Sequence, residues 1–436
     1  MKHGTVAIVG RPNVGKSSLF NRLAGDKLAI TDDASGVTRD RLYAKCSWLD
    51  QTFSIIDTGG IELNDLPFME EIKAQAELAM DEADIIVFVV DGRVGIVKED
   101  RDVMNILHRT KKPVIVAANK IDDLKYIDNT YEFYNFGVDD VIPISTLHGI
   151  GIGDLLDEII KLLPEKKERK YEDTIEFSII GQPNVGKSSL TNAILGTERV
   201  IVSDVAGTTR DAIDTPFKRD GQNYVVIDTA GIRKSGKIYE NAEKYSLLRA
   251  IKAIERSSVV LFVIDAKKGI EEQDKHVVGY AMDAGKAIII VVNKWDAVDK
   301  NDKSMQEWIK KIRNHFVFLD YAPIVFVSAL KNLRIQTIFD NIKMVYENYT
   351  RRIATNVLND VLLDATLLQD APFFNGDRLK IYYASQVEKN PPSFVLFVND
   401  PKYLHFSYQR YLENKLREAF NLEGTPIKFI LRKKDE

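Results

Sequence analysis

The sequence predicts two mostly parallel α/β sheets, each covered by helices on both faces, followed by a smaller α+β domain. Two observations support this prediction. The first is a near-identical internal repeat, GRPNVGKSSLFN from position 10 and GQPNVGKSSLTN from position 181. The second is the alternation of short apolar runs with helical stretches in both halves, which is typical of parallel strands buried on both faces.

The repeat extends well beyond that stretch. The tripeptide TRD recurs at 38 and 209, and the turns DTGG and DTAG begin at 57 and 228, with the same offset of 171 that separates positions 10 and 181. The later pairs, NKID with NKWD and STL with SAL, lie further apart, as loop insertions would cause. The unit is too long for a solenoid repeat, so the chain contains a duplicated domain.

Apolar runs predict the strands of each copy, and helices are expected between them, for example over Lys16–Leu23 and Asp154–Leu162. In open α/β sheets, ligands bind beyond the carboxyl ends of the strands, so polar residues that follow these runs are the candidates for function. The predicted strands are Thr5–Val9, Phe53–Ile56, Ile85–Val90, Val114–Ala118, Val141–Ile144, Ile175–Ile180, Tyr224–Ile227, Val259–Ile264, Ala287–Val292 and Ile324–Val327.

The predicted domains are residues 1–163, a charged linker at 164–173, a second α/β domain at 174–351 and a different domain at 352–436. The linker is highly charged and has no apolar period, as expected of an exposed connection. The elements expected in the last domain are helices over Ile353–Leu368 and Tyr403–Phe420 and strands over Leu379–Ser385, Ser393–Val398 and Ile427–Leu431.

Composition narrows the class of protein. The chain has 436 residues, is 45% hydrophobic and 28% charged, and carries a formal net charge of −4. These values are ordinary for a globular protein, and a nucleic-acid site would have to be a local basic patch. Cys46 is the only cysteine, so no intrachain disulfide can form and a reducing compartment fits. The apolar runs are far shorter than the ~20 residues of a membrane span. We expect a soluble cytoplasmic monomer without a membrane partner.

The repeated stretch fits the phosphate-loop pattern G-x-x-x-x-G-K-[ST], placed between a strand and a helix as the motif requires. Gly10 and Gly15 let backbone N–H groups curl around an anion at the positive end of the helix. Lys16 is expected to reach the β- and γ-phosphates, and the Ser17 hydroxyl to ligate Mg²⁺. An ordinary glycine-rich turn is the alternative for a single copy. The second copy supplies Gly181, Gly186, Lys187 and Ser188.

The turn after the second predicted strand is a candidate magnesium and γ-phosphate sensor. Asp57 can hold Mg²⁺, and the N–H of Gly60 can approach a γ-phosphate because glycine lets the backbone come close. Thr38 lies in the preceding polar loop, where its hydroxyl can close on Mg²⁺ only when a triphosphate is bound; an ordinary loop threonine is the alternative. The second copy supplies Asp228, Gly231 and Thr209.

The Asn-Lys-x-Asp turn selects the base. Asp122 offers two acceptor oxygens to the N1–H and exocyclic amine of guanine, and adenine presents no such donor pair. The stem of Lys120 can cover the base, Asn119 completes the motif, and a backbone N–H in the turn at Ser145 can meet the guanine O6. Alone, such a turn is often only a charged surface loop. The second copy supplies Asn293, Lys294, Asp296 and Ser328.

With both motif sets in place, the chain resembles the bacterial tandem GTPases of the Der/EngA family, which belong to the Era-like GTPases of the TrmE-Era-EngA-EngB-septin superfamily. The resemblance covers essentially the whole chain. It implies two P-loop GTPase domains, a charged linker and a C-terminal KH-like domain. It also implies a GTP-hydrolysing switch that binds GTP, GDP and Mg²⁺ and acts in assembly of the large ribosomal subunit, with the subunit or its precursor, ribosomal RNA and proteins, as partner.

Two departures within the motifs suggest how hydrolysis is assisted. Many small GTPases place a glutamine directly after D-x-x-G, whereas this chain has Ile61 and Ile232, which cannot orient water. Related GTPases with an apolar residue there often use a phosphate-loop asparagine to help bind K⁺, and Asn13 and Asn184 occupy that place. The hypothesis is that K⁺ supplies transition-state charge; the alternative is that each asparagine only stabilises its loop turn.

The last domain lacks the G-x-x-G loop with which KH domains clamp RNA, because its only glycines are Gly376 and Gly424. Two basic clusters remain as candidates for RNA phosphate contacts, with a solvated surface as the alternative. The domain is also a candidate to dock on the nucleotide domains and relay their state. The clusters are Lys428, Arg432, Lys433 and Lys434 in the last domain and Arg233, Lys234 and Lys237 after the second D-x-x-G.

Two other functions stay open on the sequence alone. A GTP-dependent metabolic enzyme would need a second catalytic constellation, and the single cysteine and the 6 histidines show no metal-ligand spacing. A scaffold with one inactive nucleotide domain would need an incomplete motif set, and both sets are complete.

Overall fold

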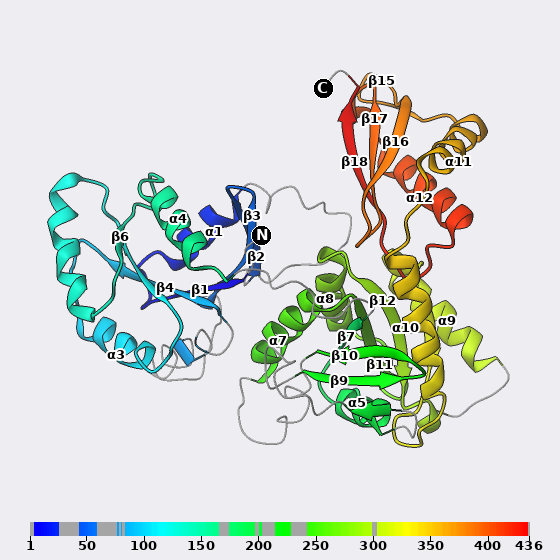
Figure 1. Ribbon diagram of the computed structural model, residues 1–436, viewed down its shortest axis with the longest axis horizontal. Coiled ribbons are helices and arrows are strands. Elements are labelled where there is room, and N and C mark those ends of the chain that lie inside the picture. The colour runs from blue at the N-terminus through cyan, green and yellow to red at the C-terminus, as the bar shows by residue number, and fades with distance from the viewer. Residues whose placement is uncertain are drawn as a thin grey trace. The chain divides into compact units, whose positions relative to one another are not determined.

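The computed structural model describes residues 4–25, 43–58, 76–77, 80, 83–164, 174–196, 200–202, 214–227, 242–298 and 303–434. Contacts divide the chain into two compact units, Met1–Lys170 and Tyr171–Glu436, which are taken in turn below (Figure 1). Within the described ranges, each helix is too short or too polar to cross a bilayer.

The first unit is built on a six-stranded sheet with the order β2-β3-β1-β4-β5-β6. All neighbours pair in parallel except β2, which runs antiparallel to β3 at the edge. The central strands are continuous Val/Ile runs with fully buried side chains, as both-face burial demands. The strands are β1 (Thr5–Val9), β2 (Tyr43–Trp48), β3 (Gln51–Asp57), β4 (Ile85–Asp91), β5 (Val114–Asn119) and β6 (Val141–Pro143).

Helices cover both faces of this sheet (Figure 1). On one face, α1 (Lys16–Ala24) and α4 (Ile152–Leu162) pack on alternate residues of β1, with Cys46 in the same core. On the other face, α3 (Lys98–Leu107) and the 3₁₀ segment η4 (Leu124–Phe136) pack on the remaining residues. The side-chain period of two along a strand separates the two cores.

The second unit begins with a seven-stranded sheet, β13-β12-β11-β7-β10-β9-β8, whose first five strands are parallel. Helices α5 (Lys187–Leu195) and α10 (Ile335–Tyr349) cover one face, and α7 (Ala242–Arg256), α8 (Glu272–Asp283) and α9 (Ser304–His315) cover the other. The strands are β7 (Thr174–Ile180), β8 (Val200–Val202), β9 (Thr215–Arg219), β10 (Gln222–Val226), β11 (Val259–Asp265), β12 (Ala287–Asn293) and β13 (Ile324–Phe326).

The C-terminal domain has a three-stranded sheet, β16-β17-β18, with β16 antiparallel and β18 parallel to the central strand. Two helices, α11 and α12, pack on one face of it. A hairpin, β14 (Phe373–Phe374) with β15 (Asp377–Arg378), lies outside the sheet. The main elements are α11 (Thr355–Leu368), β16 (Ile381–Glu388), β17 (Ser393–Val398), α12 (Phe406–Phe420) and β18 (Lys428–Lys433).

The C-terminal domain packs directly on the second nucleotide domain. The backbone N–H of Ile288, in β12, donates to Gly424 at 2.8 Å, and the Gly424 N–H donates to the Tyr321 carbonyl at 2.8 Å. The guanidinium of Arg417 lies 4.4 Å from the centroid of the half-buried Tyr321 ring. Asn348, near the end of α10, donates to the carbonyl of Glu423 at 3.0 Å. Backbone and aromatic contacts therefore join the two domains.

The predicted strands are confirmed with small shifts at their ends. The predicted helix over Tyr403–Phe420 is wrong at its start: a 3₁₀ turn, Pro401–Tyr403, is followed by extended residues, and the α-helix begins at Phe406. The His405 side chain caps that helix by accepting the Ser407 N–H at 3.2 Å. The helix predicted from Ile353 begins at Thr355. Strands β2, β8 and β9, which pair in antiparallel fashion, were not predicted.

Candidate functional site

Each phosphate loop connects the first strand of its domain to the helix that follows. Gly15 has φ +99, and a Cβ there would lie 2.2 Å from the amide nitrogen of Asn119. Gly186 has φ +97, and a Cβ there would lie 2.4 Å from the amide nitrogen of Asn293. Only glycine permits this conformation and this close approach, which brings the loop against the base-binding turn.

The phosphate-loop lysines are held by their own loops. Lys16 Nζ donates to the carbonyls of Gly10 at 2.8 Å and Arg11 at 3.0 Å. Lys187 Nζ donates to the equivalent carbonyls of Gly181 and Gln182, both at 2.7 Å. Burial lowers the pKa of Lys187 to about 8. A buried ammonium group in such a setting favours an anionic ligand, because phosphate oxygens supply the opposite charge that carbonyls lack.

Asn119 and Asn293 join the phosphate loop to the base turn in both domains. The Asn119 amide donates to the Val14 carbonyl at 2.7 Å and its oxygen accepts the Thr146 N–H at 3.0 Å. Asn293 makes the same pair of bonds, to Val185 at 3.0 Å and from Ala329 at 3.1 Å. The first asparagine of each Asn-Lys-x-Asp motif is therefore a buried structural bridge.

The two motif lysines have left-handed backbones and reach the acidic residue that ends the neighbouring strand. Lys120 has φ 70 and pairs with Asp91 at 2.7 Å. Lys294 has φ 59 and pairs with Asp265 at 2.6 Å, and it also donates to the Asn184 carbonyl at 2.7 Å. The ion pairs hold both lysine stems in place beside the base turn.

Asp122 is held by two side chains. The Ser145 hydroxyl donates to it at 2.6 Å, and the Arg93 guanidinium forms an ion pair with its other oxygen. These partners, the serine hydrogen bond first, lower the pKa of the Asp122 carboxyl, so it is ionised at neutral pH. Arg93 also donates to the Lys120 carbonyl at 3.1 Å. The sequence analysis missed Arg93, although its place directly after the strand-ending DG was visible.

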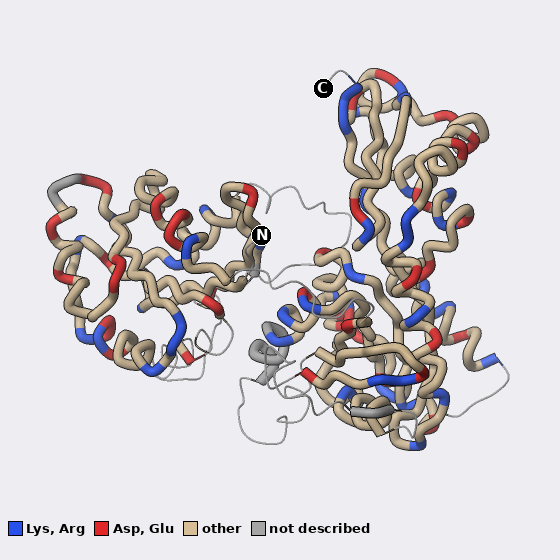
Figure 2. Tube along the Cα trace, viewed as in Figure 1, with Lys and Arg blue, Asp and Glu red and all other residues tan. Residues whose placement is uncertain are grey.

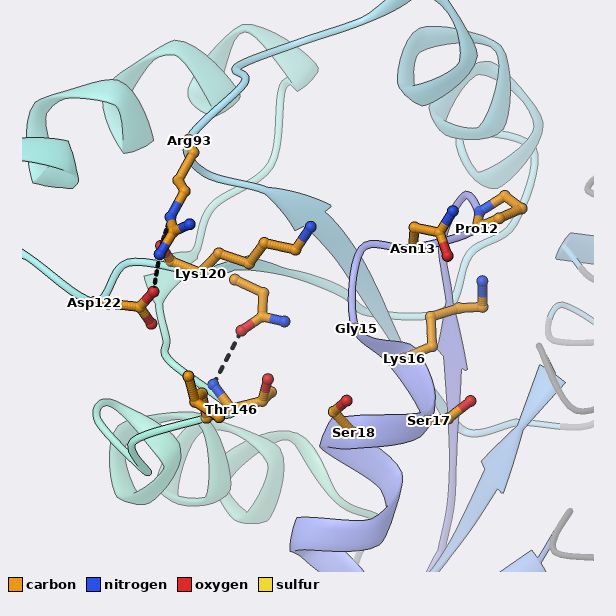
Figure 3. A pocket seen from close by; sticks show the side chains of 12 residues that line it. Pro12, Asn13, Gly15, Lys16, Ser17, Ser18, Arg93, Lys120, Asp122 and Thr146 are labelled. Carbon is orange, nitrogen blue, oxygen red and sulfur yellow. Dashed lines mark hydrogen bonds and ion pairs between the residues drawn. The ribbon is translucent and has the colours of Figure 1, made fainter.

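A cavity of about 690 Å³ unites these groups in the first domain (Figure 3). The phosphate loop, with Lys16 and Ser17, lines one side, and Asp122 with Arg93 lines the other (Figure 3). This is a common size for a small-molecule site. The remaining lining residues are Pro12, Asn13, Gly15, Ser18, Asn119, Lys120, Thr146 and Leu147.

Two backbone N–H groups of the turn that follows Ser145 make hydrogen bonds within the protein. The Thr146 N–H is taken by Asn119, and the His148 N–H donates to the Ser145 hydroxyl at 3.1 Å. Ser328 is equally buried and accepts the Lys331 N–H at 3.1 Å. Both serines thus fix the shape of their turns.

Asp57 ends β3 and is 3% exposed, and the next residue, Thr58, donates to the Ile8 carbonyl at 2.7 Å. This bond fixes the end of β3 against β1, beside the phosphate loop. The other residues expected at the magnesium and γ-phosphate position, Thr38, Gly60, Thr209, Asp228 and Gly231, lie outside the described residues, as do Ile61 and Ile232.

Asn13 and Asn184 both have φ 65, the left-handed region that asparagine tolerates better than most residues. The turn-stabilising alternative therefore has support, since each asparagine suits its backbone conformation. The Asn13 side chain also lines the cavity, as a ligand for a bound ion would (Figure 3).

A phosphate loop and a guanine-type base turn meet around one cavity on the carboxyl-end side of a mostly parallel sheet. The fold and the site therefore define a P-loop GTPase. A family model described as "50S ribosome-binding GTPase" matches residues 5–120 and 176–294. A second, described as "KH-domain-like of EngA bacterial GTPase enzymes, C-terminal", matches residues 352–432. The chain belongs to the Der/EngA family of bacterial GTPases.

Relatives cover the whole chain. A protein named GTPase Der from Geobacillus sp. (strain WCH70) is 58% identical over 433 residues, 99% of each chain. Another of that name from Oceanobacillus iheyensis is 57% identical over 435 residues and covers 100% of both. Among solved structures, the G domain of the T. maritima FeoB iron transporter is 30% identical, covers 37% of this chain and 98% of its own, and has a TM-score of 0.28.

Proposed function

We propose that both domains bind and hydrolyse GTP, and that the two sites together form a switch acting on the large ribosomal subunit or its precursor. The observation that carries this proposal is the equivalence of the two sites: loop, lysine and bridging asparagine make the same contacts in both domains. A buried asparagine contributes to a site only while both of its hydrogen-bond partners stay in place. A domain that no longer used its nucleotide site would not need to keep these contacts.

In this proposal, Lys16 and Lys187 leave their loop carbonyls and bind the β- and γ-phosphates. Mg²⁺, when bound, neutralises charge that develops on the phosphate oxygens. Ser17, which lines the cavity, and the buried Asp57 fit it because Mg²⁺ prefers oxygen ligands. Ser188, Asp228, Thr38 and Thr209 are proposed as further ligands, and the N–H groups of Gly60 and Gly231 as γ-phosphate contacts.

Guanine is proposed to bind against Asp122 in the first domain and Asp296 in the second. In the first domain the base would displace Arg93 from one oxygen of Asp122, because that carboxylate must accept two donors of the base. Arg93 is half-exposed and can move to solvent. In this proposal, the ion pair with Arg93 occupies one oxygen of the Asp122 carboxylate until the base binds.

K⁺ bound at Asn13 and at Asn184 is proposed to assist GTP hydrolysis. It would take the role that a glutamine after D-x-x-G has in many small GTPases. GTP turnover is expected to be several-fold faster in KCl than in NaCl at matched ionic strength. Asn13→Ala and Asn184→Ala should each reduce the potassium dependence of one site. Equal rates in the two salts would refute this part of the proposal and leave the phosphate chemistry intact.

The ribosomal partner is proposed from the description of the family model that matches both nucleotide domains. Basic residues gather at the C-terminal end of β18 (Figure 2), where Arg432 and Lys433 are exposed, and Lys428 is exposed at the start of that strand. They are proposed to contact RNA phosphates. Lys434 is exposed too and lies 4.6 Å from the Tyr382 ring.

Co-sedimentation with ribosomal particles tests the switch. The full chain should bind particles in one nucleotide state, either with a non-hydrolysable GTP analogue or with GDP. Lys16→Ala and Lys187→Ala, tested separately, show which site controls binding. Deleting residues 352–436 tests the C-terminal domain. Binding that is equal in both nucleotides for the wild-type chain would contradict the switch.

A further inference from the structure

The two phosphate loops differ at their second residue, Arg11 in the first and Gln182 in the second. The structure shows what each of these residues faces. Each of them faces the third residue of a helix. That helix follows the strand that ends at Asp91 in the first domain and at Asp265 in the second. That residue is Asp100 in α3 and Asp274 in α8, and both are fully or almost fully buried.

Each of these aspartates caps its helix with one oxygen. Asp100 Oδ2 accepts the Val97 N–H at 3.3 Å, and Asp274 Oδ2 accepts the Glu271 N–H at 2.9 Å. Each bond is the half of a capping box in which the third helical residue reaches back, and it satisfies one N–H at the start of its helix. Across the described residues, the remaining oxygen, Oδ1, is buried in both and lacks a hydrogen bond of good geometry. It is available to the phosphate loop.

The phosphate loop approaches that free oxygen with a different charge in each domain. Arg11 Nε lies 3.3 Å from Asp100 Oδ1, so a buried ion pair forms. The neutral, buried side chain of Gln182 lies beside Asp274, although its amide nitrogen makes no hydrogen bond of good geometry to the described residues. The backbone carbonyls of the same two loop residues accept hydrogen bonds from the phosphate-loop lysines. The distance from Nζ to the carbonyl oxygen is 3.0 Å for Arg11 and 2.7 Å for Gln182.

We propose that Arg11 and Gln182 are positioning residues that fix the phosphate-loop lysine by anchoring its carbonyl partner beside a buried helix-capping carboxylate, and that the charge of this anchor sets the pH below which its own nucleotide site loses activity. This inference rests on the proposed function, because it requires nucleotide turnover at each loop.

The two carboxyls have different charged surroundings, although burial has the largest effect on both. Burial raises the pKa of Asp100 and of Asp274 to about 6. At Asp100 the charged neighbours are Arg11, which opposes the rise, and Glu99, which adds to it. At Asp274 they are Glu271, which adds to the rise, and Lys268, which opposes it weakly; the Glu271 N–H and Gln182 also oppose it. Among the residues that the structure describes, a cation lies within ion-pair distance of Asp100 but not of Asp274.

Changing the charge of an anchor should therefore move the low-pH limit of GTP turnover at its own site. Removing the Arg11 cation should raise the pKa of Asp100, since an opposite charge at this distance lowers a carboxyl pKa by about one unit or more. Protonated Asp100 no longer holds the loop residue, so the carbonyl partner of Lys16 loosens. GTP turnover at the first site should then fail at a higher pH than in the wild type.

The experiment uses the full chain with one site silenced at its base carboxylate. In the Asp296→Asn background, kcat/KM for GTP is measured from pH 5.5 to 8.5 for the wild-type loop, Arg11→Gln, Arg11→Lys and Arg11→Gln with Asp100→Asn. Arg11→Gln should move the low-pH limit of activity up by about one pH unit, roughly a fivefold loss at pH 6. Arg11→Lys should keep the wild-type limit, and the double variant should lose the limit.

The reciprocal variant shows whether the Arg11→Gln result comes from misfolding, because it should shift the pH dependence in the opposite direction. Gln182→Arg, measured in the Asp122→Asn background, adds a cation beside a buried carboxylate and should move the low-pH limit of the second site down. An Arg11→Gln loss that is equal at all pH values, or an unshifted limit in both exchanges, would overturn the inference. No turnover by the wild-type loop in the Asp296→Asn background would instead overturn the two-site function itself.

Discussion

Replacing Asn119 by alanine should uncouple the phosphate loop from the base turn. Asn119 is 1% exposed and makes two buried bonds, to the Val14 carbonyl at 2.7 Å and from the Thr146 N–H at 3.0 Å. Alanine leaves both partners buried without a hydrogen bond, which costs about 1–3 kcal/mol for each group. Allowing for partial solvation by water, local stability should fall by about 2–4 kcal/mol.

Hydrogen exchange measured by mass spectrometry on the full chain gives this value segment by segment. A loss of about 2–4 kcal/mol corresponds to roughly 30- to 1,000-fold faster exchange, because each 1.4 kcal/mol is a factor of about ten. The effect should fall on α1 and on the turn at Thr146. GTP binding at the first site should weaken with it.

Two control variants make the result specific. Asn129→Ala is the same substitution in the same unit, and it removes only one long bond, to the Gly92 carbonyl at 3.3 Å. It should leave α1 unchanged. Asn293→Ala should reproduce the effect in the second domain and leave the first intact. If exchange in α1 changes by less than about threefold in Asn119→Ala, the bridge does not hold the site together.

Three further outcomes are expected. Asp122→Asn and Asp296→Asn should each weaken GTP binding at one site by about tenfold or more and improve xanthosine triphosphate binding, because the amide donates where the carboxylate accepted. Competition titrations measure both affinities, and an unchanged GTP affinity would contradict the base assignment. Burial raises the pKa of Cys46 to about 11, so at pH 8 a thiol reagent should label it only after unfolding in urea, and fast labelling of the folded chain would contradict its burial. Gly424→Ala places a Cβ 2.3 Å from the Val345 side chain at φ +78; it should lower the melting temperature of the second unit by several degrees in calorimetry, and an unchanged transition would show that the domain contact adapts.

The fold and most of the site could be predicted because their motifs are short and local. A phosphate loop needs its glycines, its lysine and the helix behind it within one stretch, and the strands were fully buried apolar runs. The antiparallel strands β2 and β9 could not be predicted, since their residues include polar side chains such as Lys45 and Lys218 without a continuous apolar run.

Contacts between segments that are distant in the chain could not be predicted from the sequence either. The pairing of Arg11 with Asp100 depends on how α3 meets the phosphate loop, and the pairing of Arg93 with Asp122 depends on two neighbouring strand ends. The Asn-Lys-x-Asp motif indicated the residues of the base site but not the bridging role of Asn119. The roles of Thr38 and Gly60, and of their counterparts in the second domain, stay predictions.

The central claim is that one chain carries two guanine-nucleotide sites built in the same way. Equilibrium binding of labelled GDP to the full chain, with Mg²⁺ present, tests it most directly. The account predicts two GDP molecules per wild-type chain, and one for each of the variants Asp122→Asn and Asp296→Asn. A wild-type stoichiometry of one, abolished by only one of the two substitutions, would contradict the claim.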